Sequence, residues 1–303
     1  MYIVIIQTVH NIIIRKLFNL SMGKEKSKVA IVDLKGGFGN QLFQLCFANY
    51  LISYNIDTYI NSRNFERSKN IKNLDVDLRE LILPVEFFGM KEISDEKFMI
   101  LETIQKMSRG VLVKKFNDKN FEINKLKRIN RLDGYWQNLD YFKFSKNYLI
   151  STLSNNNKLK NAIYSKKSEG STMVHVRRSD YLRLGEELEI KYYENSINKA
   201  RERVEKFSFT VFTDDKTWVQ EHKIFDDANN IFSSSNSKSD TLNTFAEMLK
   251  FENYIISNST FSLMASLLSQ TNRSIIYIPD PWFRKSKKII NYENSIKIAN
   301  SKD

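Results

Sequence analysis

The chain of 303 residues is poor in cysteine, histidine, proline and glycine. Its single cysteine, Cys46, excludes a disulfide-stapled scaffold and a cysteine-based zinc cluster, and it suits a reducing cytoplasm. Only three histidines are present, so we expect no multi-histidine metal site. Three prolines and nine glycines exclude collagen-like and low-complexity chains. The sequence also lacks an uninterrupted run of about 20 apolar residues, which a membrane-spanning helix needs.

What remains is the composition of an ordinary globular protein, with 42% hydrophobic and 27% charged residues. The length suits two domains of about 150 residues each. Lysine and arginine number 47 against 35 acidic residues, and the net charge of +12 favours anionic partners such as nucleic acid, phosphorylated small molecules or an acidic membrane. Abundant Lys, Asn and Ile indicate AT-rich codons, so the charge alone does not choose among these partners.

The amino terminus differs from the rest of the chain. Residues 2–20 are apolar but are interrupted by polar residues such as Gln7 and Arg15, and they lack the charge order and cleavage site of a signal peptide. An interfacial anchor fits this pattern, and so does a translation start at Met22. We favour the second interpretation and expect residues 1–27 to be a leader outside the fold.

Strands and helices alternate in two stretches on either side of a polar segment at 154–171, our candidate linker. The first stretch opens with a strand at 29–34 and a helix that is apolar on nearly all sides. In the second, single helices separate five predicted strands, at 172–176, 207–212, 229–232, 253–257 and 274–278. This alternation predicts an α/β fold with parallel sheets, whose binding sites collect at the carboxyl ends of the strands. We expect domains at 28–165 and 166–303.

Three glycines, Gly36, Gly37 and Gly39, separate the first strand from the first helix. Backbone amides can approach a ligand closely there, and Asn40 can cap the helix. The dinucleotide fingerprint fails because Leu42 occupies its third glycine position, and the chain has no Walker-type phosphate loop. A ligand loop and a simple tight turn both remain open.

The strand at 172–176 contains His175 near its end and is followed by Arg177, Arg178 and Asp180. Two adjacent arginines at the end of a strand are costly to bury unless they bind an anion, and arginine suits bidentate phosphate contacts. A surface ion-pair cluster is the alternative.

Polar residues also follow two further strands. Asp214 and Asp215 fit a Mg²⁺ site, a general base or a helix cap. Ser259, Thr260 and Ser262 open a helix, where hydroxyls and free amides form an anion site without a metal, or act only as a cap. Because all three clusters end strands of the same half, they predict one site for an anionic group.

The order of these motifs resembles that of the family 11 glycosyltransferases, the α-1,2-fucosyltransferases of bacteria and animals. More distantly it is similar to the α-1,6- and protein O-fucosyltransferases. The matching segments are GGFGNQLFQ at 36–44, GYWQ at 134–137, HVRRSDY at 175–181, VFTDD at 211–215, IISNSTFS at 255–262 and PWF at 281–283. The resemblance covers roughly residues 29–283.

This resemblance implies a GT-B architecture, in which two Rossmann-like domains with parallel sheets face each other across a cleft. It implies an acceptor-side domain first and a nucleotide-sugar donor domain second, with room for a last helix that returns to the first domain. The implied reaction is an inverting transfer of L-fucose from GDP-L-fucose to a galactoside hydroxyl, in α-1,2 linkage, during surface glycan or O-antigen synthesis. No metal or other cofactor is implied. The acceptor would be a glycan or a lipid-linked oligosaccharide, and the enzyme cytoplasmic, with peripheral contact at the inner membrane face allowed.

The resemblance also assigns roles by position. Arg177 would contact the β-phosphate and steady the departing GDP, with Arg178 nearby, while His175 and Asp180 shape the guanosine side and order the arginines. Asn40 would lie near the reacting sugar, so the predicted catalytic residues are Arg177, Asn40 and Asp180. The remaining predicted site residues are the donor-binding Asp214, Asp215, Ser259, Thr260, Phe261 and Ser262 and the glycine loop of Gly36, Gly37 and Gly39.

Two departures from the family pattern leave a different donor open. Residues 263–267 read LMASL where many members have WWGAW, and Thr244 stands where an aspartate is common. The alternative is therefore the same fold with another nucleotide sugar. A basic nucleic-acid-binding protein, suggested only by the net charge, is disfavoured because no known module or aromatic-basic face is present.

Overall fold

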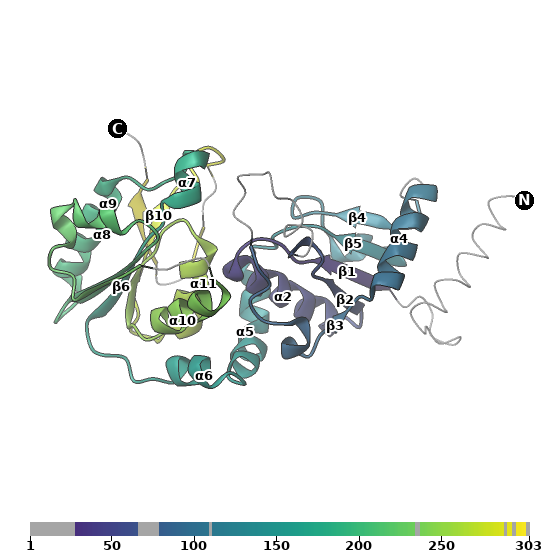
Figure 1. The fold of residues 1–303 in the computed structure, drawn as a ribbon, viewed down its shortest axis with the longest axis horizontal. Helices are drawn as coiled ribbons and strands as arrows, with labels where there is room; N and C mark the ends of the chain where they lie inside the picture. Colours follow the sequence, from purple (N-terminus) through teal and green to yellow (C-terminus); the bar gives the residue numbers. More distant parts are fainter. Residues whose placement is uncertain are drawn as a thin grey trace, which may run out of the picture.

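The computed structural model describes residues 28–65, 79–108, 111–233, 237–287, 290–292 and 295–300. The leader predicted at 1–27 lies outside these residues. The described chain forms two α/β halves, each built on a parallel sheet (Figure 1). The predicted fold class is thereby confirmed. None of the described helices is both long and apolar enough to cross a membrane.

The first half is built on a five-stranded sheet of order β3-β2-β1-β5-β4. Its strands are β1 (Val29–Asp33), β2 (Asp57–Asn61), β3 (Lys91–Glu92), β4 (Lys114–Phe116) and β5 (Ile129–Leu132). Its helices are α2 (Phe38–Ser53), α4 (Asp95–Met107), α5 (Leu139–Leu153) and α6 (Asn157–Ile163), with 3₁₀ turns η1 (Val85–Phe88) and η2 (Ile123–Lys125). Every residue of the central strand β1 is buried, as its apolar sequence predicts.

Helix α2 is buried on most of its surface, as predicted from apolar residues on nearly all sides. It packs between its own sheet and the second half, where it contacts α11 (Thr260–Ser269). The helix begins at Phe38 with Gly37 as its N-cap. The expectation that Asn40 caps this helix is therefore wrong, because the helix starts two residues earlier and Asn40 lies in its first turn.

The second half is built on a six-stranded parallel sheet of order β11-β10-β9-β6-β7-β8. Its strands are β6 (Ser171–Val176), β7 (Ser208–Thr213), β8 (Asn230–Ser233), β9 (Asn253–Ile255), β10 (Ile276–Asp280) and β11 (Ser295–Ala299). Helices α7 (Ser179–Leu184), α8 (Ile190–Arg203), α9 (Lys216–Gln220), α10 (Lys238–Met248) and α11 connect them, with the 3₁₀ turn η3 (Lys223–Phe225). All five strands predicted here are confirmed, each to within two residues at its start.

Two features at the ends of this half differ from the sequence interpretation. The polar stretch at 154–171 contains helix α6, which contacts α5 and α10 and so touches both halves. At the carboxyl end the resemblance left room for a last helix that returns to the first domain. The described residues there form strand β11 instead, which pairs in parallel with β10 of the second sheet.

The two halves share a buried apolar seam. One continuous core cluster includes residues from both sheets and from α2, α10 and α11. Within it, the ring of Phe38 meets the ring of Phe245 edge-on, with ring centroids 5.0 Å apart. The start of α2 is therefore held against the second half, close to the ends of its strands.

Candidate active site

Strands β9, β6 and β7 are neighbours in the second sheet, so the three polar clusters that follow them lie side by side. The predicted grouping of these clusters is present in the structure. Nη1 of Arg177, after β6, lies 2.9 Å from Oδ2 of Asp214, after β7. On the other side, Nδ1 of His175 lies 2.8 Å from the hydroxyl oxygen of Ser257, after β9.

The guanidinium group of Arg177 is largely buried and is held by two carboxylates. Its Nη2 lies 2.7 Å from Oδ1 of Asp180, and its Nε donates to the same oxygen at 3.0 Å. Burial works against the charge of Arg177, but the charges of Asp214 and Asp180 outweigh it and raise its pKa. The side chain is therefore a permanent cation with a fixed orientation.

The neighbouring guanidinium group, that of Arg178, is turned to a different set of partners. Its Nε donates to Oδ2 of Asp215 at 3.1 Å, and its Cζ lies 4.2 Å from the ring centre of Trp218. The backbone N–H of Arg178 donates to Oδ1 of Asp214 at 2.8 Å. Arg178 thus packs against α9, while Arg177 occupies the middle of the cluster.

Both carboxylates of the Thr-Asp-Asp motif therefore engage arginines. Asp215 is also the N-cap of α9, because its Oδ1 accepts the backbone N–H of Trp218 at 3.1 Å. Of the three roles left open by the sequence, the helix cap is confirmed for Asp215. Within the ranges that the structure describes, no group of three or more His, Cys, Asp or Glu side chains is arranged to hold a metal ion.

His175 is buried beneath the arginines. Burial, and then the nearby charge of Arg177, lower its pKa to about 3. The imidazole is therefore neutral near pH 7 and is a poor candidate for an acid or a base. Its contacts, to Ser257 and to the ring of Phe261 at 6.2 Å between centroids, are those of a group that supports the strand end.

Asp180 links the two halves. Its Oδ1 accepts from Arg177, and its Oδ2 lies 2.9 Å from Nη2 of Arg79, a residue of the first half. Sequence reasoning did not identify Arg79, because nothing in its local pattern marks it. The pairing shows that Asp180 orients Arg177 while it holds the halves in register at this edge.

A second contact between the halves joins the glycine loop to the start of α11. Oδ1 of Asn40 accepts a hydrogen bond from the hydroxyl of Thr260 at 2.9 Å and another from Nε2 of Gln137 at 2.9 Å. A Cβ at Gly39 would lie 2.3 Å from the carbonyl oxygen of Thr260. Glycine is thus required at position 39 because α2 closely approaches the backbone of α11 there. Neither the ligand loop nor the tight turn considered from the sequence predicted this close approach.

The other two loop glycines differ in their surroundings. Gly36 has a φ of +79°, a left-handed conformation that favours glycine, so a tight turn is confirmed at this position. Around Gly37 the structure has nothing within 4 Å of an added Cβ.

The hydroxyls at the start of α11 mainly serve that helix. Ser259 is its N-cap, with Oγ accepting the backbone N–H of Phe261 at 3.3 Å, which confirms the capping interpretation. The hydroxyl of Ser262 is buried and donates to the carbonyl of Ser259 at 3.2 Å. The ring of Phe261 packs against that of Phe245 with centroids 5.3 Å apart. Contacts of these residues with a donor remain predictions.

The GYWQ segment holds Gln137 in place through an unusual turn. Trp136 has a φ of +52°, a conformation that non-glycine residues adopt rarely. Asp118 stabilises the turn, because its carboxylate accepts the backbone N–H groups of Tyr135, at 2.9 Å, and of Trp136. Sequence reasoning identified GYWQ but missed Asp118. A positive φ cannot be identified from a local pattern that lacks glycine at that position.

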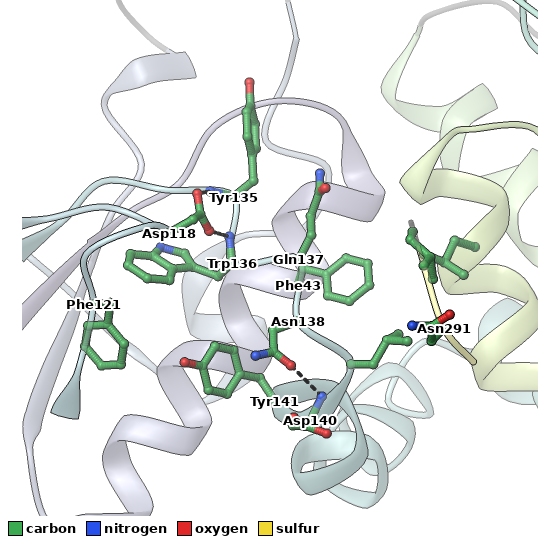
Figure 2. Close-up of a pocket in the computed structure, with 13 residues that line it drawn as sticks. Phe43, Asp118, Phe121, Tyr135, Trp136, Gln137, Asn138, Asp140, Tyr141 and Asn291 are labelled. Carbon is green, nitrogen blue, oxygen red and sulfur yellow. Dashed lines mark hydrogen bonds between the residues drawn. The ribbon is translucent and has the colours of Figure 1, made fainter. Parts of the chain in front are cut away.

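A pocket of about 570 Å³ opens beside this turn (Figure 2). Its wall is formed by the segment that runs into α5, by one face of α2 and by residues of the second half. The lining residues are Phe43, Asp118, Phe121, Tyr135, Trp136, Gln137, Asn138, Leu139, Asp140, Tyr141, Leu263, Ile290 and Asn291. The pocket therefore lies between the halves, next to the contact of Gln137 with Asn40.

Comparisons with known proteins agree on one family. The model of glycosyl transferase family 11 matches residues 3–298, a range that includes most of the undescribed leader. An α-1,2-colitosyltransferase of Escherichia coli is 29% identical over 285 residues, which cover 86% of this chain and 94% of that protein. The O-antigen biosynthesis glycosyltransferase WbnK of Escherichia coli is 24% identical over 294 residues, covering 84% and 95%. Among solved structures, the fucosyltransferase NodZ from Bradyrhizobium matches with a TM-score of 0.41 and 16% identity, over 80% of this chain and 93% of that one.

Proposed function

The chain belongs to glycosyl transferase family 11, and we propose that it transfers L-fucose, or a closely related deoxyhexose, from its GDP-activated form to a galactoside hydroxyl. The transfer is inverting and forms an α-1,2 linkage in a surface glycan such as an O-antigen. The observation that carries this proposal is Arg177, a buried cation held between Asp180 and Asp214 at the ends of three neighbouring strands. Ligands of parallel α/β sheets bind at such an edge.

The reaction places specific demands on the residues at this edge. Breaking the bond between the sugar C1 and the phosphate oxygen creates an oxocarbenium-like centre and adds negative charge to the departing GDP. A cation aimed at the β-phosphate therefore stabilises the transition state more than the ground state. Arg177 supplies this charge, and its two carboxylates hold the guanidinium ready before the reaction begins. Asp180 acts by orienting Arg177, and Asn40, in the first turn of α2, acts on the reacting sugar.

A strong general base is less necessary in such a reaction. GDP is a good leaving group, so bond breaking runs ahead of attack by the acceptor hydroxyl. The neutral, buried state of His175 fits this picture, because a pKa of about 3 makes the imidazole too weak a base to accept a proton near neutral pH. We assign His175 to the support of Arg177 rather than to proton transfer.

One observation also supports a second donor, GDP-colitose. Colitose is L-fucose without its 3-hydroxyl, and the relative with 29% identity is named as a colitosyltransferase. Thr244 and residues 263–267, where the chain departs from the common family pattern, lie on α10 and α11 beside the predicted site. A site that hydrogen-bonds a sugar hydroxyl rejects the analogue lacking it by about 10⁴–10⁵, whereas a site without that contact does not. GDP-colitose is therefore the alternative donor.

A donor screen by calorimetry tests the proposal, with GDP, GDP-L-fucose, GDP-colitose, GDP-mannose and UDP-galactose as ligands. We expect GDP and a GDP-deoxyhexose to bind and UDP-galactose not to bind. The product formed on a galactoside acceptor should show an α-anomeric proton by NMR, inverted from the β-linked donor. Binding of a UDP-sugar in preference to all GDP compounds would overturn the proposed donor class, and retention of the donor's anomeric configuration would overturn the inverting mechanism.

We further propose that donor binding requires no metal. The support is that Asp214 and Asp215, the two carboxylates at the strand end, already engage Arg177 and Arg178. GDP affinity measured in millimolar EDTA should then equal that measured with Mg²⁺. A loss of about tenfold on chelation, roughly 1.4 kcal/mol, would show instead that these carboxylates bind a metal.

For the acceptor we propose a glycan or a lipid-linked oligosaccharide, with the enzyme in the cytoplasm at the inner face of the membrane. The net charge of +12 supports attraction to anionic lipid and to a diphosphate-linked acceptor. Sedimentation with vesicles of defined anionic lipid content, at low and high salt, measures this contact directly. Equal recovery with neutral and anionic vesicles would contradict it.

A further inference from the structure

We propose that the pocket beside the GYWQ turn binds a neutral sugar ring of the acceptor glycan. The proposal rests on the proposed function, in that it assigns the acceptor a place on the enzyme. The pocket volume of about 570 Å³ lies within the range of about 300–1,000 Å³ that is usual for small-molecule sites. Figure 2 shows side chains from both halves lining it, with Asn291 across from Asp140 and Tyr141.

The charges of the pocket indicate the class of its ligand. The chain carries 47 lysines and arginines, yet none of them is among the described residues that line this pocket. Its charged side chains are two aspartates, Asp118 and Asp140. The lining offers a phosphate group two carboxylates and no cation, so the pocket is unsuited to the nucleotide. Carboxylates that accept hydrogen bonds suit a neutral ligand rich in hydroxyl groups.

The remaining lining matches the two kinds of surface on a sugar ring. Phe43, Tyr135 and Tyr141 supply apolar ring surface for the C–H faces of the sugar, while Asn138 and Asn291 supply amide groups for its hydroxyls. Burial, and then the charges of Asp118 and Asp140, raise the pKa of Tyr141. The phenol is therefore protonated at neutral pH and can donate a hydrogen bond.

The pocket is shaped before any ligand arrives. Asp118 holds the turn at Trp136, whose φ of +52° is a conformation that non-glycine residues rarely adopt. Trp136 is 2% exposed, and its indole N–H has no hydrogen-bond acceptor among the described residues. A strained turn and an unpaired buried donor in one wall are features of a binding site more than of a wall that serves packing alone.

A single side chain joins the pocket to the predicted reaction centre. Gln137 lines the pocket and donates to Oδ1 of Asn40 at 2.9 Å. Phe43 and Leu263 lie one helical turn beyond Asn40 and Thr260, so the pocket follows directly from the contact between α2 and α11. A sugar bound in this pocket contacts Gln137, which in turn contacts Asn40, the asparagine assigned to the reacting centre. An acceptor must lie this close to the reacting sugar.

Near-isosteric variants test the proposal. Asp140→Asn removes a charge and Tyr141→Phe removes a hydroxyl, and both positions line the pocket. The matched controls are Asp227→Asn, at an exposed aspartate paired with Arg201, and Tyr164→Phe, at an exposed tyrosine. Steady-state kinetics with methyl β-galactoside as acceptor give KM and kcat, and calorimetry gives the affinity for GDP.

We expect the acceptor KM to rise about tenfold in Asp140→Asn, because a hydrogen bond to a carboxylate becomes a weaker one to an amide, and to rise also in Tyr141→Phe, where a donor is lost. GDP affinity should stay at the wild-type value in all four proteins, and the controls should keep the wild-type KM. An acceptor KM within twofold of wild type in both pocket variants would overturn the proposal.

Binding measured without turnover separates this proposal from the proposed function. If the wild-type protein transfers no sugar from any GDP donor, the function fails, and saturation-transfer NMR with methyl β-galactoside still tests the pocket. Saturation that is present in the wild type and in Asp227→Asn but lost in Asp140→Asn supports the pocket. A galactoside signal that is absent from the wild type, or unchanged in Asp140→Asn, refutes it.

Discussion

Replacing Gly39 by alanine tests how closely α2 and α11 must approach. The added Cβ would lie 2.3 Å from the carbonyl oxygen of Thr260 and 2.6 Å from the backbone nitrogen of Phe261, whereas real Cβ contacts stay beyond 3.0 Å. These are backbone atoms at the start of a helix, which cannot rotate away as a side chain can. The two helices must therefore separate. Overpacking of this kind costs about 1–3 kcal/mol of stability.

The separation should also affect catalysis, because the hydrogen bond from Thr260 to Asn40 crosses the same contact. A displacement of about 1 Å at a reacting group can cost about 10²-fold in rate, so we expect Gly39→Ala to lose about that much in kcat. The matched control is Gly37→Ala, where φ is −71° and nothing lies within 4 Å of the new Cβ.

Urea unfolding and transfer kinetics on both variants decide the matter. Gly37→Ala meets no steric contact, so its loss should be limited to that of an alanine at the N-cap of α2, about 1 kcal/mol or less. If Gly39→Ala matches Gly37→Ala in both stability and kcat, the argument from close approach is wrong. If Gly39→Ala does not fold, Thr260→Val removes the hydroxyl that donates to Asn40 with little change of shape, and it should still lower kcat.

Two further predictions concern the second half. Arg177→Lys keeps the charge but loses the planar guanidinium, so kcat at saturating donor should fall about 10²–10³-fold. The loss in Arg178→Lys should be milder. If Arg177→Lys keeps more than about a tenth of the wild-type kcat, the leaving-group role of Arg177 is excluded. His175 has a folded pKa of about 3 against 6.5 for the free side chain, so the unfolded chain binds the extra proton and stability falls as pH drops from about 6.5 towards 3. Between pH 7 and 5.5 this effect lowers the stability of the wild-type protein by about 1 kcal/mol. Urea unfolding at both pH values should show a loss smaller by that amount in His175→Asn. An equal loss in the wild type and in His175→Asn would contradict the neutral buried state.

The second sheet could be predicted well from the sequence, while parts of the first could not. Strand β5 (Ile129–Leu132) was missed because its middle residues, Asn130 and Arg131, are polar. In the structure Asn130 is buried and donates to the carbonyl of Val29 at 2.9 Å, and Arg131 pairs with Asp33 at 2.7 Å. Both partners lie on a distant strand. A local hydrophobic pattern cannot supply them, so the strand reads as a polar segment.

The candidate site divides in the same way. Residues at strand ends, such as Arg177 and Asp214, could be predicted because a parallel sheet brings its carboxyl ends together. The groups that orient them could not, since Arg79 reaches Asp180 and Gln137 reaches Asn40 across about a hundred residues of sequence. These contacts depend on how the two halves pack, which no motif spacing expresses.

The charges of the site show what its arginines contribute. Three arginines face three aspartates in one set, joined by ion pairs and by the hydrogen bond from the backbone N–H of Arg178 to Asp214. The set comprises Arg79, Arg177, Arg178, Asp180, Asp214 and Asp215. The formal charge of this set is zero, so the excess of basic residues in the chain lies elsewhere and does not itself attract the diphosphate to this point. The aspartates instead hold the guanidinium groups in fixed directions, so that little reorganisation is needed when charge develops on the leaving group. Orientation rather than total charge then determines the rate, and a lysine at position 177 would supply the charge without the orientation.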